Sequence, residues 1–228
     1  MIKVTAVSYL NTKPLLYGIF QKGLDEMMDL SLDIPSEGAR KLISGEVDLG
    51  LIPVAVIPQI ENPHIISDYC IGAEGAVRTV SIFSERPLEE LTHIYLDYHS
   101  RTSAALTQVL IKEYWKLPIK FIQASEGYEQ NIKGTTGGLI IGDRAIHTPY
   151  AFHYDLAEAW KIHTGLPFVF AAWVSNKKLP DEFVKIFNEA LAIGIQKIDQ
   201  LVYLIQSPHP SFSISDYYKK YINYHLTE

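Results

Sequence analysis

Cysteine is nearly absent from this sequence, with Cys70 the only one among 228 residues. A single cysteine can form no internal disulfide and cannot supply a thiolate zinc cluster. We expect Cys70 to be buried as a small apolar side chain, as free cysteines commonly are. The hydrophobic fraction of 47% is that of an ordinary globular protein. A chain of this length buries enough surface to fold without disulfides or a metal.

Positive charge is scarce: 20 lysines and arginines face 26 acidic residues, and the formal net charge is −6. Proteins that bind nucleic acid or anionic membranes non-specifically normally carry the opposite sign. We therefore expect neither a nucleic-acid nor a membrane partner. Attraction for an anion would have to come from helix N-termini and individual arginines. The arginines are Arg40, Arg78, Arg86, Arg101 and Arg144.

Long apolar runs and cofactor motifs are missing as well. No stretch reaches the ~20 apolar residues of a membrane-spanning helix. Met1–Ser8 does not resemble a signal peptide, and we expect a cytoplasmic protein. The histidines show no metal-ligand spacing such as HExxH. Gly72–Gly75 and Gly134–Gly138 lack the dinucleotide and phosphate-loop patterns, so we expect no cofactor and no metal.

The N-terminal part alternates strands with helices. Ile2–Ser8, Leu30–Ile34 and Val47–Pro53 read as strands because they are apolar and rich in β-branched residues. Pro14 suits the first turn of a helix, and Ser36 suits the N-cap of another. This β-α-β-α-β order predicts a parallel sheet covered by helices.

A second, smaller α/β unit begins after Pro87. Ser100 is expected to cap its long helix. The extended segments near 77–84 and 168–174 then predict two strands that cross between the units. We expect residues 1–84 plus 172–228 to form one lobe and residues 85–171 an inserted second lobe. Ligands of open parallel sheets bind beyond the carboxyl ends of strands, and pockets favour domain interfaces, so the cleft is the expected site.

Two helical patterns close the chain, Pro180–Ile205 and Ser213–Leu226. The second is rich in tyrosine at helical spacing. Such a stripe is either core or a contact surface, and helical spacing alone favours core. The tyrosines are Tyr217, Tyr218, Tyr221 and Tyr224.

Five motifs stand out along the chain, namely Val7–Gly18 (VSYLNTKPLLYG), Gly75–Thr79 (GAVRT), Ser100–Ala105 (SRTSAA), Leu139–Ala145 (LIIGDRA) and Thr164–Trp173 (TGLPFVFAAW). In this order they resemble motifs of the chorismate dehydratase family, and the resemblance extends over most of the range 1–175. Leu42–Ile52 (LISGEVDLGLI) resembles a step found across type II periplasmic-binding-protein folds. The resemblance implies an α/β fold of that type, with two lobes, crossing strands and an interlobe cleft.

The same resemblance implies a hydro-lyase that removes water from chorismate to give 3-[(1-carboxyvinyl)oxy]benzoate, the entry step to menaquinone by the futalosine route. The expected partner is thus a small dicarboxylate. The related 1,4-dihydroxy-6-naphthoate synthase shares the fold but typically opens with SPCPND, where this chain has SYLNTK. A non-catalytic small-anion-binding protein is a further alternative, normally carrying an export signal. The effector domain of a transcription regulator would need a DNA-binding motif ahead of Ile2. The sequence does not predict the oligomeric state.

Three residues are candidates for a catalytic role, and Asn11 is the one favoured for contact with the reacting ring. The resemblance places an asparagine of the family at Asn11, whose alternative role is that of a turn residue. Thr79 lies in the proposed crossing strand, and Arg78 should then point to the opposite side. Asp143, at the end of a buried strand, could be an acid, a base or a cap.

The remaining candidates are expected to bind the substrate. Ser100, Arg101, Thr102 and Ser103 stand at a strand-to-helix junction, where backbone N–H groups and hydroxyls can bind an anion. Thr102 and Ser103 are preferred to Arg101, and Ser8 and Gly142 complete the set. Asp97 is expected to brace the Ser100 loop. Because the shared motifs contain few acids, a substrate carboxylate is a further candidate for the base.

Overall fold

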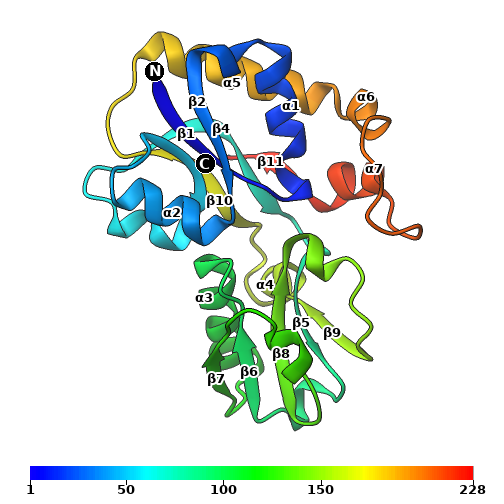
Figure 1. The fold of residues 1–228 in the computed structure, drawn as a ribbon. Helices are drawn as coiled ribbons and strands as arrows, with labels where there is room; N and C mark the ends of the chain where they lie inside the picture. Colours follow the sequence, from blue (N-terminus) through cyan, green and yellow to red (C-terminus); the bar gives the residue numbers. More distant parts are fainter. Residues whose placement is uncertain (228) are drawn as a thin grey trace.

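The computed structural model describes residues 1–227 and shows two α/β lobes, one above the other in Figure 1. The larger lobe is built on a six-stranded sheet with the order β11-β4-β10-β3-β1-β2. Its strands are β1 (Ile2–Val7), β2 (Met28–Asp33), β3 (Leu49–Pro53), β4 (His64–Ala73), β10 (Phe168–Ser175) and β11 (Asn223–His225). Its helices are α1 (Lys13–Gln21), α2 (Pro35–Ile43), α5 (Asp181–Gln196), α6 (Ile198–Val202) and α7 (Ile214–Asp216).

The smaller lobe is built on a five-stranded sheet with the order β7-β6-β8-β5-β9. Its strands are β5 (Val80–Ser84), β6 (His93–Leu96), β7 (Lys120–Gln123), β8 (Thr136–Ile141) and β9 (Phe152–Asp155). Helix α3 (Arg101–Val109), prolonged by a π-helical turn over Leu110–Trp115, and helix α4 (Leu156–Thr164) pack against it.

The N-terminal strands form the predicted parallel sheet. β1 pairs in parallel with β2, Ile2 lying opposite Met28, and in parallel with β3. The prediction for the start of α2 is wrong in one detail. Pro35 stands in the first turn of α2, a position that suits the fixed φ of proline. The side chain of Ser36 is not the predicted N-cap, because it makes no capping hydrogen bond. The Ser36 N–H instead donates to the carbonyl of His99 in the smaller lobe, at 2.9 Å.

The chain passes between the two sheets twice, as the extended segments predict. β5 pairs antiparallel with β8 and β9, so it belongs to the smaller sheet, although the expected division at residue 84 assigns it to the first lobe. All of β10 pairs with β3 and β4 in the larger sheet, although the division at 171 splits it. Strand pairing therefore moves both crossings a few residues toward the N-terminus.

The C-terminal segment is not the single helix that its tyrosine spacing predicts. After α7 and a π-helical turn over Tyr217–Tyr221, the chain extends as β11 and pairs antiparallel with β4, with Asn223 opposite Gly72. The free edge of β4 pairs with this segment as a strand, and the spacing of the tyrosines in the sequence does not indicate such a pairing. The pattern over Pro180–Ile205 is likewise divided, into α5 and α6.

Three of the C-terminal tyrosines are core residues, which confirms the favoured prediction. Tyr217, Tyr218 and Tyr224 are each at most 3% exposed. The Tyr218 hydroxyl donates to the carbonyl of Leu10 at 3.0 Å, and the Tyr224 hydroxyl donates to the carbonyl of Asn11 at 2.8 Å. The end of the chain therefore holds the turn that follows β1.

Helix α1, which begins just after this turn, is fixed against α5 by two glycines. A Cβ on Gly18 would lie 1.9 Å from the carbonyl oxygen of Ala190, and one on Gly194 would lie 1.9 Å from that of Pro14. The two helices therefore meet backbone to backbone, and neither position has room for a side chain.

Two expectations from composition concern the core and the membrane. Cys70 is buried, as predicted, and burial raises the pKa of its thiol to about 12. Within residues 1–227, no helix combines the length and the apolar character that crossing a membrane requires.

Candidate functional site

A cavity lies where the two lobes meet, at the cleft that the sequence predicts. Tyr9, Asn11, Thr79, Ser100 and Ser103 supply its polar lining. It encloses about 40 Å³, whereas small-molecule sites commonly measure ~300–1,000 Å³. The lobes are therefore closed tightly on each other, and they must separate to admit a metabolite.

The polar lining comes from ends of strands and the start of one helix. Tyr9 and Asn11 follow the carboxyl end of β1, and Gly142 follows that of β8. Thr79 lies in the first crossing, immediately before β5, and Ser100 caps α3 by accepting the N–H of Ser103. Because parallel strands present their carboxyl ends at one edge of a sheet, these side chains gather at the cleft.

Asn11 lines the cavity, and its backbone is fixed by a residue that does not line it. Its carbonyl accepts the Tyr224 hydroxyl, and its side-chain oxygen accepts the hydroxyl of Thr12 at 3.2 Å. Asn11 therefore takes part in the turn and faces the cavity at once, and the two roles that the sequence leaves open are compatible.

Thr79 and Arg78 point in different directions, as expected. Thr79 is 1% exposed, and its hydroxyl shares a hydrogen bond of 2.8 Å with that of Tyr217. Arg78 lies on the other side of the crossing, where it donates to the Tyr221 hydroxyl at 2.9 Å. The cause is not the pleat of a strand, because Arg78 has a left-handed backbone with φ of 70°.

Asp143 bridges the lobes. Its carboxylate accepts the N–H of Leu10, with oxygens at 3.0 and 3.2 Å. Desolvation by the surrounding protein raises the pKa of Asp143, against the opposing effects of that hydrogen bond and the charge of Lys13. One side of the residue stays open to water. The carboxylate thus holds the turn after β1 in the other lobe, and not the turn that follows Asp143, which the sequence offers it to cap.

The four residues at the start of α3 divide into two pairs. Ser100 and Ser103 line the cavity, and the Ser103 hydroxyl donates to that of Ser100 at 3.2 Å. Thr102 is turned away: its hydroxyl accepts the N–H of Ala55 in the larger lobe at 3.0 Å. Arg101 is exposed and donates to the side chain of Gln59 at 3.2 Å.

The last two expected site residues differ in position. Gly142 lines the cavity, with φ of 66°. Ser8 is exposed and lies outside the cavity lining, and its N–H donates to the carbonyl of Asp33 at 3.0 Å, continuing the pairing of β1 with β2.

Tyr9 and His99 are neighbours that sequence reasoning missed. The Tyr9 hydroxyl and Nδ1 of His99 form a short hydrogen bond across the cleft. Burial raises the pKa of Tyr9 above its usual range, although the charge of Arg144 acts against it. Burial and the same arginine lower the pKa of His99. The position of Tyr9 within VSYLNTKPLLYG was its only signal, because its partner lies 90 residues away.

Asp97 braces the Ser100 loop, as expected. It is 2% exposed, and it accepts the N–H of His99 at 2.8 Å and the hydroxyl of Tyr128 at 3.0 Å. The guanidinium of Arg144 also donates to it at 2.5 Å, and to Glu129 at 2.6 Å. The two terminal nitrogens of Arg144 are therefore paired with carboxylates of its own lobe, whereas its buried Nε has no hydrogen-bond partner among residues 1–227.

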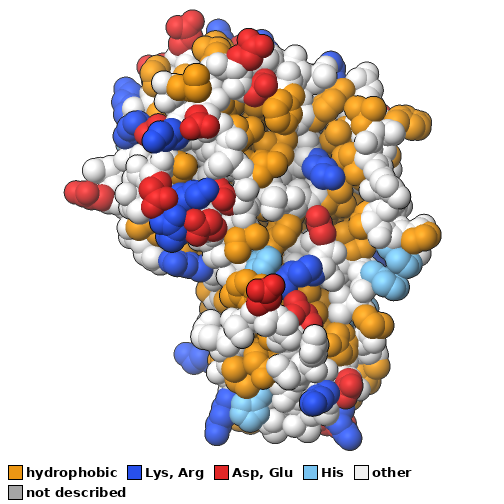
Figure 2. Space-filling model, in the orientation of Figure 1, with side chains coloured by type: hydrophobic (Ala, Val, Ile, Leu, Met, Phe, Trp, Pro, Cys, Tyr) orange, Lys and Arg blue, Asp and Glu red, His pale blue; other side chains and the backbone are white. Residues whose placement is uncertain are grey.

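No arginine or lysine among residues 1–227 lines the cavity. The charges of the surface are also mixed. Figure 2 shows acidic and basic side chains interspersed over α2, where Arg40 pairs with Glu37 and Glu46. An anion in the cavity would thus be held by hydroxyl and N–H donors. No group of three or more metal-binding side chains occurs in the described part of the chain.

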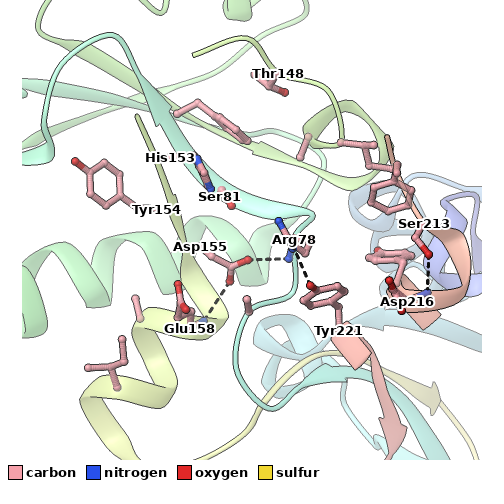
Figure 3. Close-up of a pocket in the computed structure, with 18 of the residues that line it drawn as sticks. Arg78, Ser81, Thr148, His153, Tyr154, Asp155, Glu158, Ser213, Asp216 and Tyr221 are labelled. Atoms are coloured by element: carbon pink, nitrogen blue, oxygen red, sulfur yellow. Dashed lines mark hydrogen bonds between the residues drawn. The ribbon is translucent and has the colours of Figure 1, made fainter. Parts of the chain in front are cut away.

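A larger groove of about 780 Å³ lies on the outer side of the crossing, shown in Figure 3. Several of its polar groups already have hydrogen-bond partners. Arg78 lies over the ring of Tyr221, 4.7 Å from its centre, and Asp155 accepts the N–H groups of Val77 and Arg78. Ser213 and Asp216 belong to one helix cap. The interlobe cavity is smaller, but it is lined by residues of the sequence motifs, such as Asn11, Thr79 and Ser100.

Comparison with known proteins identifies the family of the chain and supports the fold. A family model described as menaquinone biosynthesis matches residues 2–228. A protein of Thermus thermophilus named chorismate dehydratase is 30% identical over 190 residues, which are 74% of this chain and 69% of that protein.

Solved structures share the fold at low sequence identity. A protein from Archaeoglobus fulgidus aligns with a TM-score of 0.68 and 14% identity, covering 96% of this chain and 81% of that one. A Candida albicans protein described as having the generic periplasmic-binding-protein fold aligns with a TM-score of 0.61 and 16% identity, covering 98% of this chain and 81% of that one. An ABC transporter structure from Parabacteroides distasonis aligns with a TM-score of 0.60 and 16% identity, covering 98% of this chain and 86% of that one. The expected two-lobed fold is confirmed.

Proposed function

Because the chain belongs to the menaquinone biosynthesis family, we propose that it is a chorismate dehydratase. The reaction is the loss of water from chorismate to give 3-[(1-carboxyvinyl)oxy]benzoate, which makes the protein a hydro-lyase. The observation that carries the proposal is the convergence of Asn11, Thr79, Ser100 and Gly142 on one cavity, since each lies in a segment resembling that family. The name of the Thermus relative agrees with it.

The cavity suits a dicarboxylate that bridges two lobes. Donors come from the larger lobe through the turn after β1, and from the smaller lobe through Ser100 and Ser103 at the start of α3. Helix N-termini bind anions because their first N–H groups have no partner within the helix. Binding would then stabilise the closed arrangement, which excludes water from the reacting ring.

The chemistry asks little of the protein because aromatisation of the ring supplies driving force. We assign ring contact to Asn11 and Thr79. Asp143 is assigned a positioning role, since its carboxylate holds the N–H of Leu10, one residue before Asn11. The base is then a carboxylate of the substrate itself, positioned over the ring proton by the closed lobes.

The experiment is direct: purified protein is incubated with chorismate and the products are separated. The proposal expects a product lighter than chorismate by one water, with the ultraviolet absorbance of an aromatic ether. Tight binding of chorismate without any change would contradict the enzyme assignment and favour a non-catalytic binding protein. A naphthoate product from the corresponding precursor would favour the related synthase.

A further inference from the structure

We propose that Tyr9 is a further catalytic residue of this site, whose phenol gives its proton to the hydroxyl that leaves the ring, with His99 as the residue that positions it. This inference rests on the proposed dehydratase function. It comes from the cavity itself: among the described residues that line it, Tyr9 carries the only ionisable side chain. The other polar groups are the amide of Asn11 and hydroxyls of serine and threonine, which are far weaker acids than a phenol.

The position of Tyr9 is built from both lobes. Tyr9 follows β1 of the larger lobe, and His99 follows β6 of the smaller one. Their rings are within 2° of parallel, with centroids 6.1 Å apart, so the hydroxyl and Nδ1 meet nearly edge to edge. Gly142 leaves room for the phenol, because a Cβ there would lie 2.7 Å from two ring atoms of Tyr9. The pair therefore forms only when the lobes close.

The surroundings keep both partners in the forms that this role requires. A phenol holds its proton at neutral pH. Burial and Arg144 lower the pKa of His99, which keeps the imidazole neutral. A neutral imidazole carries one N–H. With that proton on Nδ1, His99 donates to the phenol oxygen and leaves the phenol proton for a ligand. The Asp97 carboxylate accepts the backbone N–H of His99 and so fixes the loop that carries it.

The proposed elimination breaks two bonds of the substrate. The ring C–H bond breaks, its proton passes to the base, and its electron pair completes the aromatic ring. The C–O bond breaks with its electrons going to oxygen, which takes the phenol proton and leaves as water. The resulting phenolate of Tyr9 is stabilised by the His99 N–H and by the nearby charge of Arg144. The proton removed from the ring then returns to Tyr9, so no other reactant is needed.

The test compares Tyr9→Phe with Tyr98→Phe. Tyr98 is a matched control, because its ring packs edge-on against His99 at 4.5 Å but does not line the cavity. Loss of a general acid costs about 10²–10⁴-fold in rate. We expect kcat of Tyr9→Phe to fall by that factor while chorismate binding is kept, and Tyr98→Phe to stay near wild type. His99→Gln is expected to lower kcat as well, though less.

A second readout separates proton donation from a structural role. Difluorotyrosine at position 9 keeps the shape of the phenol but makes it a stronger acid. Because burial raises the pKa of Tyr9, the wild type should keep its activity at alkaline pH, whereas the difluorotyrosine protein should lose activity there if the phenol must be protonated and keep it if the ring only packs. A pH profile unchanged by difluorotyrosine, or Tyr9→Phe as fast as wild type, would overturn the inference while the dehydratase function stands. A wild-type protein that does not dehydrate chorismate would remove both.

Discussion

Gly142 lies directly beneath the ring of Tyr9, so closely that a Cβ at this position would approach Cε2 and Cζ of the phenol to 2.7 Å. The contact joins the end of a strand in the smaller lobe to the turn after β1 in the larger one. It is one of the points at which the two lobes touch beside the cavity, together with the Tyr9–His99 and Leu10–Asp143 hydrogen bonds. Closure therefore depends on the missing side chain of Gly142.

Replacing Gly142 by alanine should hold the lobes apart. The variant meets two obstacles, the left-handed backbone with φ of 66° and the ring of Tyr9. Gly134→Ala is the matched control, since φ there is 59° and no atom lies within 4 Å of the new Cβ. The backbone alone costs about 1–2 kcal/mol in each variant. We expect activity to fall only in Gly142→Ala, together with a larger radius of gyration by X-ray scattering. Equal behaviour of the two variants would rule out the contact as the cause.

Asp143 offers a test of the base. Asp143→Asn keeps an oxygen that accepts the N–H of Leu10, so dehydration should remain measurable. Asp143→Ala removes the acceptor, and the loss of about 1–2 kcal/mol corresponds to roughly tenfold weaker closure. We expect this as a higher KM in steady-state kinetics. If Asp143→Asn lost all turnover while still binding chorismate, the base would be Asp143 and not the substrate.

Stability should depend on pH through His99. Its pKa in the folded protein is lowered by burial and by Arg144. The unfolded chain therefore takes up a proton below about pH 6.5 that the folded chain does not. The stabilising contribution is complete above that pH and is lost as the pH falls toward the folded value. Urea unfolding at about pH 7.5 and about pH 5.5 should show a smaller loss for His99→Asn than for wild type. Identical losses would contradict this assignment.

Tyr224 should influence the site although it does not line the cavity. Tyr224→Phe removes the hydroxyl that donates to the carbonyl of Asn11 at 2.8 Å, at a position 3% exposed. The unpaired carbonyl should lower the free energy of unfolding by about 1 kcal/mol and loosen the Asn11 turn. We expect a raised KM, whereas Tyr203→Phe, at a residue 90% exposed, should leave KM unchanged. A wild-type KM in Tyr224→Phe would show that the turn holds without this bond.

Local signals in the sequence predicted much of the fold. The β-branched strand at residues 2–7 and the serine that caps α3 are both found. The ends of the crossing strands were placed less well, because pairing decides them: β5 bonds with β8 across more than 50 intervening residues. The C-terminal strand β11 was missed for the same reason, since the edge of β4 selects it.

The sequence predicted the position of Asn11 and Thr79 at the interlobe cavity, which both residues line, because residue type and position along the chain were enough. It was not predicted where a role depends on a distant partner. The Thr102 hydroxyl accepts the N–H of Ala55, and the Tyr9 hydroxyl is positioned by its hydrogen bond with His99. Neither contact can be predicted from the residues nearby in the sequence.

The proposed function requires a dicarboxylate to bind between the two lobes. The most direct measurement is a crystal structure of the protein with chorismate or its aromatic product. Difference density is expected between the lobes, within hydrogen-bonding distance of Asn11, Thr79 and the start of α3. Density in the outer groove beside Arg78 and Tyr221, with the interlobe cavity unchanged, would contradict the account.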